Sequence, residues 1–295
     1  MDELRKFHVK TLRCFQSLPI RTSTAVVYML IGALPIEAEL HKRQLSLLYS
    51  ILTSENSKLQ NLMERQLVVN SNNKASFFGR IQEILEYYNL KSIHDLANNL
   101  PPKLQWKKQI MSIISEKWNN KFKNEMEEKV TLKFCNKEEV GINKTHPVWD
   151  TLPSVTHEVK KAQIKARLIT GTYLLQAEIQ KFNKEKEIKK CTLCHIEQET
   201  LEHFLLRCTA THEKRNKTFP VLKRILTESV GQQNWTEKFT NNKNLLIQVI
   251  LDPSVLCSDN TISRETLVKL ESSSRELCYS LHTHRVLLHR LLQNQ

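Results

Sequence analysis

Four residues in one short stretch have the types and the spacing of a metal site. Cys191, Cys194, His203 and Cys208 follow the pattern C-x2-C-x8-H-x4-C. Three thiolates and one imidazole make a complete tetrahedral ligand set for a closed, structural Zn²⁺ site. The sequence therefore predicts one structural zinc ion, and the binding of such an ion would itself fold the segment.

The elements that must position these ligands are short. A tight turn over residues 191–194 would face both sulfurs inward, and residues 199–208 are expected to form a short helix that buries three apolar side chains, Leu201, Phe204 and Leu205. His195 and His212 are alternative ligands to His203. We favour His203 because the four residues between it and Cys208 match the spacing of zinc knuckles. The knuckle as a whole is placed at about residues 186–212.

Two other interpretations apply to the same residues. Cys194, His203 and Cys208 could be ordinary core residues, because free cysteines are often buried. The C-x2-C pair could instead be a redox pair, but that interpretation requires a strand-rich, thioredoxin-like context, which this sequence lacks.

The chain is strongly basic. It has a formal net charge of +13 and a pI of about 9.4, which indicates a polyanionic partner or an acidic surface. Residues 151–190 hold nine Lys and Arg against four Asp and Glu, and no other segment is as basic. This segment leads directly into the first metal ligand.

Cysteine usage and hydropathy indicate the compartment. Seven cysteines, an odd number and mostly in one cluster, suit a reducing environment and a metal better than a disulfide framework. No run of eighteen apolar residues is present, and the first residues lack the apolar core of a secretory signal. We therefore expect an intracellular protein, nuclear and/or cytoplasmic, without a membrane partner.

Helical periodicity dominates the sequence, and only five glycines interrupt it. The predicted fold class is all-α. The main expected helices cover residues 4–15, 25–31, 36–52, 59–67, 75–88, 102–122, 155–170, 211–226, 243–251 and 263–292. Periodicity is lost over residues 130–148, so we place a boundary there, between a domain of residues 1–140 and a domain of residues 141–295.

Two of these helices have distinctive patterns. Residues 25–31 are apolar all round, which predicts a central core helix, preceded by capping hydroxyls and closed by Gly32. Residues 263–292 carry leucines near heptad spacing, but Ser274 and His284 interrupt the pattern. We therefore expect this helix to pack onto the domain. It also carries a stripe of three residues, His282, Arg285 and His289, that could be a solvated face, a phosphate contact or a metal site.

The order of several motifs is similar to one protein family. The motifs are residues 18–40 (LPIRTSTAVVYMLIGALPIEAEL), 165–173 (KARLITGTY), 191–208 with their ETLEHFLLRC block, and 275–282 (RELCYSLH), and their positions span most of the chain. They resemble the thumb and CCHC zinc-knuckle region at the C-terminal end of reverse transcriptases from non-LTR (LINE-type) retrotransposons.

The resemblance implies a fold and a function. Residues 1–140 would be a thumb-like helical bundle, and residues 141–295 a basic helical domain with the zinc knuckle and a long C-terminal helix. In the family, thumb and knuckle grip the template RNA and the target DNA. We expect binding mainly through phosphates, with low sequence specificity. The predicted phosphate contacts are Lys160, Lys161, Lys165, Arg167, Lys189, Lys190, Arg207 and Arg215.

The catalytic residues of that family have no counterpart here. Reverse transcription needs paired aspartates that hold two Mg²⁺ ions. The chain has five aspartates, and no two are adjacent: Asp2, Asp95, Asp150, Asp252 and Asp259. We therefore predict a non-catalytic chain and, as a further partner, a reverse transcriptase palm domain that is missing from this chain. The alternatives are a protein-interaction scaffold whose zinc is purely structural, and a retrotransposon relic without a selected function.

Overall fold

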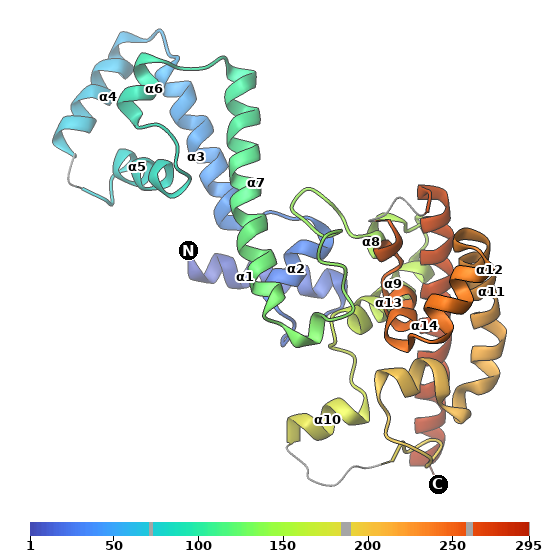
Figure 1. The fold of residues 1–295 in the computed structure, drawn as a ribbon. Helices are drawn as coiled ribbons and strands as arrows, with labels where there is room; N and C mark the ends of the chain where they lie inside the picture. The colour runs from blue at the N-terminus through green and yellow to red at the C-terminus, as the bar shows by residue number, and fades with distance from the viewer. Residues whose placement is uncertain (71–72, 184–189, 258–261, 295) are drawn as a thin grey trace. The chain divides into compact units, whose positions relative to one another are not determined.

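The computed structural model describes residues 1–70, 73–183, 190–257 and 262–294, and over these residues the protein is all-α, without strands (Figure 1). The predicted fold class is therefore confirmed. The α-helices are α1 (Asp2–Gln16), α2 (Thr24–Ile31), α3 (Ile36–Leu52), α4 (Ser57–Val69), α5 (Phe77–Tyr87), α6 (Ile93–Asn98), α7 (Lys103–Glu127), α8 (Pro147–Asp150), α9 (Thr156–Ile169), α10 (Gln176–Asn183), α11 (His212–Val230), α12 (Gln232–Asn234), α13 (Lys243–Leu251) and α14 (Arg264–Gln293).

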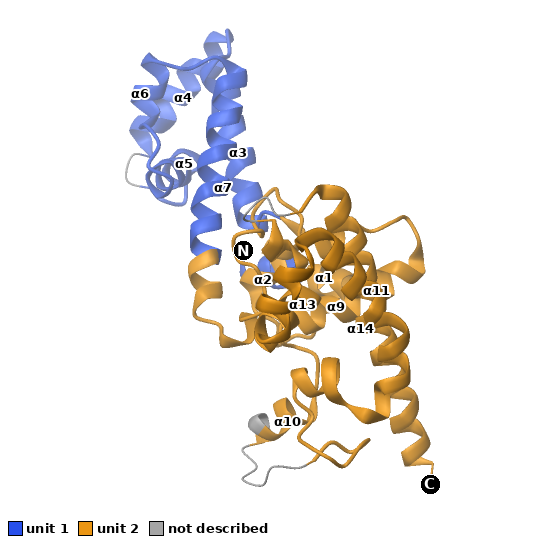
Figure 2. Cartoon of the chain, turned by 45° about the vertical axis from the view of Figure 1, so that its right-hand side comes forward, with its two compact units in different colours: residues 1–9, 33–122 blue, residues 10–32, 123–295 orange. Residues whose placement is uncertain are grey.

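The chain divides into two compact units (Figure 2). Unit 1 comprises residues 1–9 and 33–122, and unit 2 comprises residues 10–32 and 123–295. This division differs from the predicted one at residue 140. The reason is that the apolar helix α2 and the segment after residue 122 belong to the core of unit 2.

Unit 1 is a small helical bundle built from α3 to α6 and the first part of α7. Its core is apolar, with Leu45 and Leu48 of α3 and Ile81 and Leu85 of α5 fully buried. Trp106 of α7 is also buried, and its indole N–H donates to the carbonyl oxygen of Leu45. Side chains of Asn56, Ser76 and Ser92 accept bonds from the first free amides of α4, α5 and α6, as helix caps do.

In unit 2, α2 is the central core helix that its sequence predicts, with every residue from 25 to 30 buried. It ends at Gly32 in a left-handed conformation with φ of 67°. A Cβ there would meet the Lys144 backbone at 2.8 Å, so glycine permits the close approach of the 141–146 loop. Ser23 occupies the capping position before α2, but its side chain makes no hydrogen bond to the first amides of the helix, in contrast to the predicted hydroxyl cap.

The long helix α14 packs against α9 and α11, as predicted for a helix that docks on its own domain (Figure 1). Its leucines at 267, 270, 277 and 281 are buried. Ser274, which breaks the heptad pattern, is also buried and donates to the carbonyl oxygen of Ile250. The interruption is thus a specific polar contact with α13.

No single helix among the described residues is long and apolar enough to cross a membrane, although α2 and α3 taken together as a bent pair meet the length and composition criteria.

Candidate metal centre

The metal loop, residues 191–208, folds as two halves. In the first half, the amide of His195 donates to the carbonyl of Cys191 at 2.9 Å, and the amide of Cys191 donates to the carbonyl of Glu197 at 2.8 Å. His195 takes a left-handed conformation with φ of 56°, which closes the turn. These contacts form the tight turn predicted for the C-x2-C pair.

The second half is helical, but with an unexpected pitch. Residues 203–207 form a π-helical turn, in which the amide of Cys208 donates to the carbonyl of His203 at 2.7 Å. Phe204 and Leu205 are buried as predicted, while Leu201 is only half-buried. The wider π turn, which spans five residues instead of four, brings Cys208 beside His203.

The four predicted ligands lie together. One donor atom from each of Cys191, Cys194, His203 and Cys208 falls within 4.8 Å of the others, and Cys194 Sγ lies 3.4 Å from His203 Nε2. Ligands of a tetrahedral zinc ion lie roughly 3.3–3.8 Å apart, so a small contraction would complete the site. All except Cys194 are buried. This buried Cys₃His group could hold one metal ion, whereas His195 and His212 are exposed and outside it.

A carboxylate orients the histidine. His203 Nδ1 lies 2.9 Å from Glu197 Oε1, which leaves Nε2 directed at the sulfurs. The hydrogen bond with His203 holds the pKa of Glu197 below its ordinary value. Carboxylates that bind the second nitrogen of a ligand histidine fix its tautomer and raise its basicity. Glu197 stands between the two ligand pairs in the sequence, but spacing alone did not predict this role.

The sulfurs also interact with each other. The Cys191 thiol donates a hydrogen bond to Cys208, and this bond lowers the pKa of Cys208 to about 7 and raises the pKa of Cys191 to about 12. Metal ions bind thiolates, so this group is chemically prepared for a cation.

Two arginines anchor the metal loop to the rest of unit 2. Arg215 of α11 donates to the carbonyl oxygens of Leu205 and Cys208, each at 2.9 Å. Arg285 of α14 forms a two-pronged ion pair with buried Glu199, at 2.6 and 2.8 Å. The loop is therefore held from both helices. Arg285 belongs to the stripe of His282, Arg285 and His289 on α14. His282 Nδ1 also has a partner, the Tyr173 hydroxyl at 2.8 Å, so two of the three stripe residues contact other parts of the protein.

Four of the eight predicted phosphate contacts are buried or half-buried and have internal partners. Lys165 is fully buried, with its ammonium 2.7 Å from Glu271, and Arg215 is 7 % exposed. Lys165 and Arg215 are therefore not on the surface in this structure, where a phosphate contact would need them. Lys161 is also enclosed, with Nζ 2.6 Å from both Glu158 and Glu276. Half-buried Arg167 donates to the carbonyl and hydroxyl oxygens of Ser17.

The remaining predicted contacts differ in their surroundings. Lys160 and Lys190 are exposed. Arg207 is half-exposed and lies 2.8 Å from Glu202. Lys189 lies outside the described residues. The structure therefore brings the four metal ligands together, but it does not gather the eight cations into one patch.

Comparison of the chain with protein-family models, with curated proteins and with solved structures finds no match.

Proposed function

We propose that the Cys₃His group binds one structural Zn²⁺ and that the chain is the zinc-stabilised, non-catalytic, nucleic-acid-binding part of a LINE-type reverse transcriptase-like protein. The observation that carries this proposal is the convergence of three sulfurs and one imidazole nitrogen within 4.8 Å. Thiolate and imidazole ligands in a closed tetrahedral arrangement favour zinc over the hard cations Mg²⁺ and Ca²⁺.

The charge of unit 2 supports a polyanionic partner. This unit holds 30 Lys and Arg against 21 Asp and Glu, whereas unit 1 holds 14 against 10. Near the metal loop, Lys190 and Lys243 are exposed and Arg207 is half-exposed. We propose these three cations as the phosphate contacts of the loop. Lys160 of α9 is a further exposed candidate.

The scaffold alternative has its own support. Because Lys161, Lys165, Arg167 and Arg215 bind internal partners, much of the basic excess ahead of the metal loop stabilises the fold. A protein-interaction domain needs cations such as these four for its own fold, and needs no further cations for binding phosphates. The two functions differ in how their binding depends on salt.

A salt-dependent titration tests the nucleic-acid function. Zinc-loaded full-length protein is titrated with labelled RNA and DNA between about 50 and about 200 mM salt. Phosphate contacts predict a linear fall of log K with log salt. The variant Lys190→Gln/Arg207→Gln/Lys243→Gln should reduce the slope by roughly 2–3, because each lost contact removes roughly 0.7–0.9.

The matched control is Lys217→Gln/Lys223→Gln/Arg224→Gln, which removes three exposed cations of α11 that lie outside the metal loop. Equal losses from both triple variants would indicate diffuse attraction without a site. Absence of binding at low salt would leave the scaffold as the better function.

A further inference from the structure

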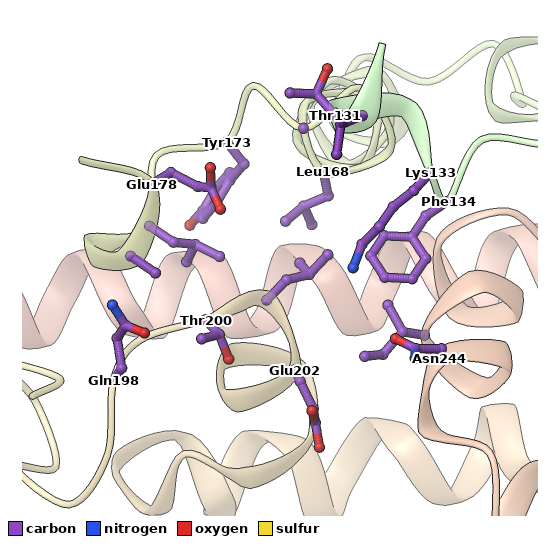
Figure 3. A pocket seen from close by; sticks show the side chains of 16 residues that line it. Thr131, Lys133, Phe134, Leu168, Tyr173, Glu178, Gln198, Thr200, Glu202 and Asn244 are labelled. Carbon is purple, nitrogen blue, oxygen red and sulfur yellow. The ribbon is translucent and has the colours of Figure 1, made fainter. Parts of the chain in front are cut away.

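A cavity lies beside the metal loop within unit 2 (Figure 3). Its volume is about 390 Å³, which is in the range of small-ligand sites. Residues 198–202 of the metal loop form one wall. The other walls come from residues 130–134, from the end of α9 through the start of α10, and from α13.

The walls of this cavity are apolar and closely supported. Phe134, Leu168 and Ile247 line it, and all three are buried. Gly171 packs so closely on the 130–134 segment that a Cβ would meet the Thr131 carbonyl oxygen at 2.6 Å. Such a preformed space would bury a flat, largely apolar ring without a large rearrangement.

Two exposed polar side chains at the cavity wall, those of Lys133 and Asn244, make no ion pair or hydrogen bond within the described part of the chain. Among the described residues, the Lys133 ammonium has no ion pair or hydrogen bond and lies 4.4 Å from the centre of the Phe134 ring, and the Asn244 amide also makes no hydrogen bond. In Figure 3 both lie on the same side of the cavity as Phe134. A cation and an amide that are both free suit a ligand with an anion and a hydrogen-bonding edge.

Most of the other polar residues of the cavity already have partners. Thr200 accepts a bond from the amide of His203, and Gln198 donates to Gln180. The carboxylate of Glu202 forms ion pairs with Arg207 at 2.8 Å and with Lys243 at 3.6 Å. Glu178, opposite Lys133 in Figure 3, also has a partner. Lys133 and Asn244, together with the hydroxyl of Thr131, are therefore the groups that remain for a ligand among the described residues.

We propose that this cavity takes one unpaired base of a single-stranded nucleic acid, with Asn244 on the edge of the base and Lys133 on its phosphate. This inference rests on the proposed nucleic-acid function and adds to it a preference for single strands. Unpaired bases are commonly buried against apolar and aromatic side chains and read on their edges, and an amide pairs well with adjacent donor and acceptor atoms. A base that is paired and stacked in a duplex would have to leave the stack before it could enter this cavity.

The cavity also depends on the metal loop. Residues 198–202 lie between the two ligand pairs, and Thr200 bonds the amide of the ligand His203. Loss of the metal would release this wall. Single-strand preference should therefore require zinc, whereas simple attraction between a basic protein and a polyanion would not.

The test compares a short single-stranded RNA with the duplex of the same sequence, using zinc-loaded full-length protein. We expect tighter binding of the single strand. Asn244→Leu and Lys133→Met should each weaken single-strand binding about tenfold, which is the typical size of one good base or phosphate contact, and should leave duplex binding unchanged. Asn124→Leu and Lys129→Met are matched controls on exposed residues outside the cavity, and should change affinity less than about twofold.

A second measurement does not depend on the variants. An oligonucleotide with one 2-aminopurine base should change its fluorescence on binding, and chelation of zinc should abolish the change. Equal affinity for single strand and duplex, with no effect of Asn244→Leu and Lys133→Met, would overturn the base-binding inference and leave the nucleic-acid function intact. Failure of the wild-type protein to bind either nucleic acid would overturn both.

Discussion

The metal loop and helix α9 are both tied to α14 through buried polar contacts, but their polar groups are satisfied in different ways. On α9, the Lys165 ammonium meets the Glu271 carboxylate at 2.7 Å with both side chains fully buried, and Arg275 lies 3.7 Å from the same carboxylate. In the metal loop, four electron-pair donors converge.

The difference separates buried polar groups that neutralise one another from buried groups that could bind a cation. A buried cation beside a carboxylate is electrically complete, so it contributes to the structure and has little left for a partner. Three thiols and an imidazole within 4.8 Å have no cation among them, and they are complete only when one binds. We therefore assign a ligand to the loop and a structural role to the α9 cations.

The largest expected effect is that of removing the metal. A structural zinc site of this kind contributes on the order of 10 kcal/mol of apparent binding free energy. A strong chelator should therefore unfold residues 191–208, seen as rapid proteolysis and amide exchange in this segment. The α9–α14 contact should keep its protection, because it contains no metal ligand. Unchanged protection in the metal loop would contradict the assignment.

Breaking the buried pair on α9 should have the next largest effect. Lys165→Met leaves Glu271 buried without its main partner, which should lower the free energy of unfolding by roughly 3–5 kcal/mol. The double variant Lys165→Met/Glu271→Leu should recover most of this loss, because apolar residues can replace a buried pair. Chemical denaturation measures both. A single variant as stable as the wild type would show that the pair contributes little.

A smaller effect is expected for the carboxylate of Glu197, which binds the second ring nitrogen of His203. Glu197→Gln keeps the shape of the side chain but weakens its hydrogen bond to His203, and should lower zinc affinity about 10- to 100-fold. Competition with a chromogenic chelator measures the affinity. Glu213→Gln is the control, since Glu213 forms an exposed pair with Lys217 and is not near a ligand. Equal affinity in wild type and Glu197→Gln would remove Glu197 from the site.

The last and smallest effect is a pH dependence of stability that is confined to acid pH, and it concerns a third buried charge, Asp252. Burial alone would raise the pKa of Asp252, but His146, with bonds from Ser254 and from the Asn136 amide, holds this pKa below its ordinary value of 3.8. A lowered folded-state pKa contributes stability that is complete above pH 3.8 and is lost as pH falls through the folded value.

Acid titration of stability by circular dichroism checks this sign. Asp252→Asn should lose part of the dependence of unfolding on pH below about 4. Between pH 5 and 8 the contribution of Asp252 to wild-type stability should be constant, so Asp252 should add no pH dependence there. A wild type whose stability rises as pH falls below 3.8 would contradict the lowered pKa of Asp252.

Local patterns were the most predictable from the sequence. The ligand set, the core helix α2 and the docking of α14 each follow from residues close together in the chain, because a turn or a helix face is fixed by its own spacing. The role of Gly32 followed in the same way. The π turn before Cys208 did not, because it has no sequence signal of its own.

Contacts between distant residues were not predictable in this way. The carboxylate that neutralises Lys165 lies 106 residues away, and the serine that holds Arg167 lies 150 residues away. A count of charges along the sequence cannot reveal such partners, so it overestimated the basic surface of α9. The partner of Arg285, Glu199, escaped prediction for the same reason.

The central claim is that the metal loop binds one zinc ion, and metal analysis of purified protein tests it most directly. We predict close to one zinc per chain in the wild type and much less than one in Cys191→Ser and in Cys208→Ser. Lys165→Met should keep the full amount in its folded fraction, because the α9 pair contains no ligand. Full zinc retention in both cysteine variants, or a folded wild type that takes up no zinc, would contradict the account.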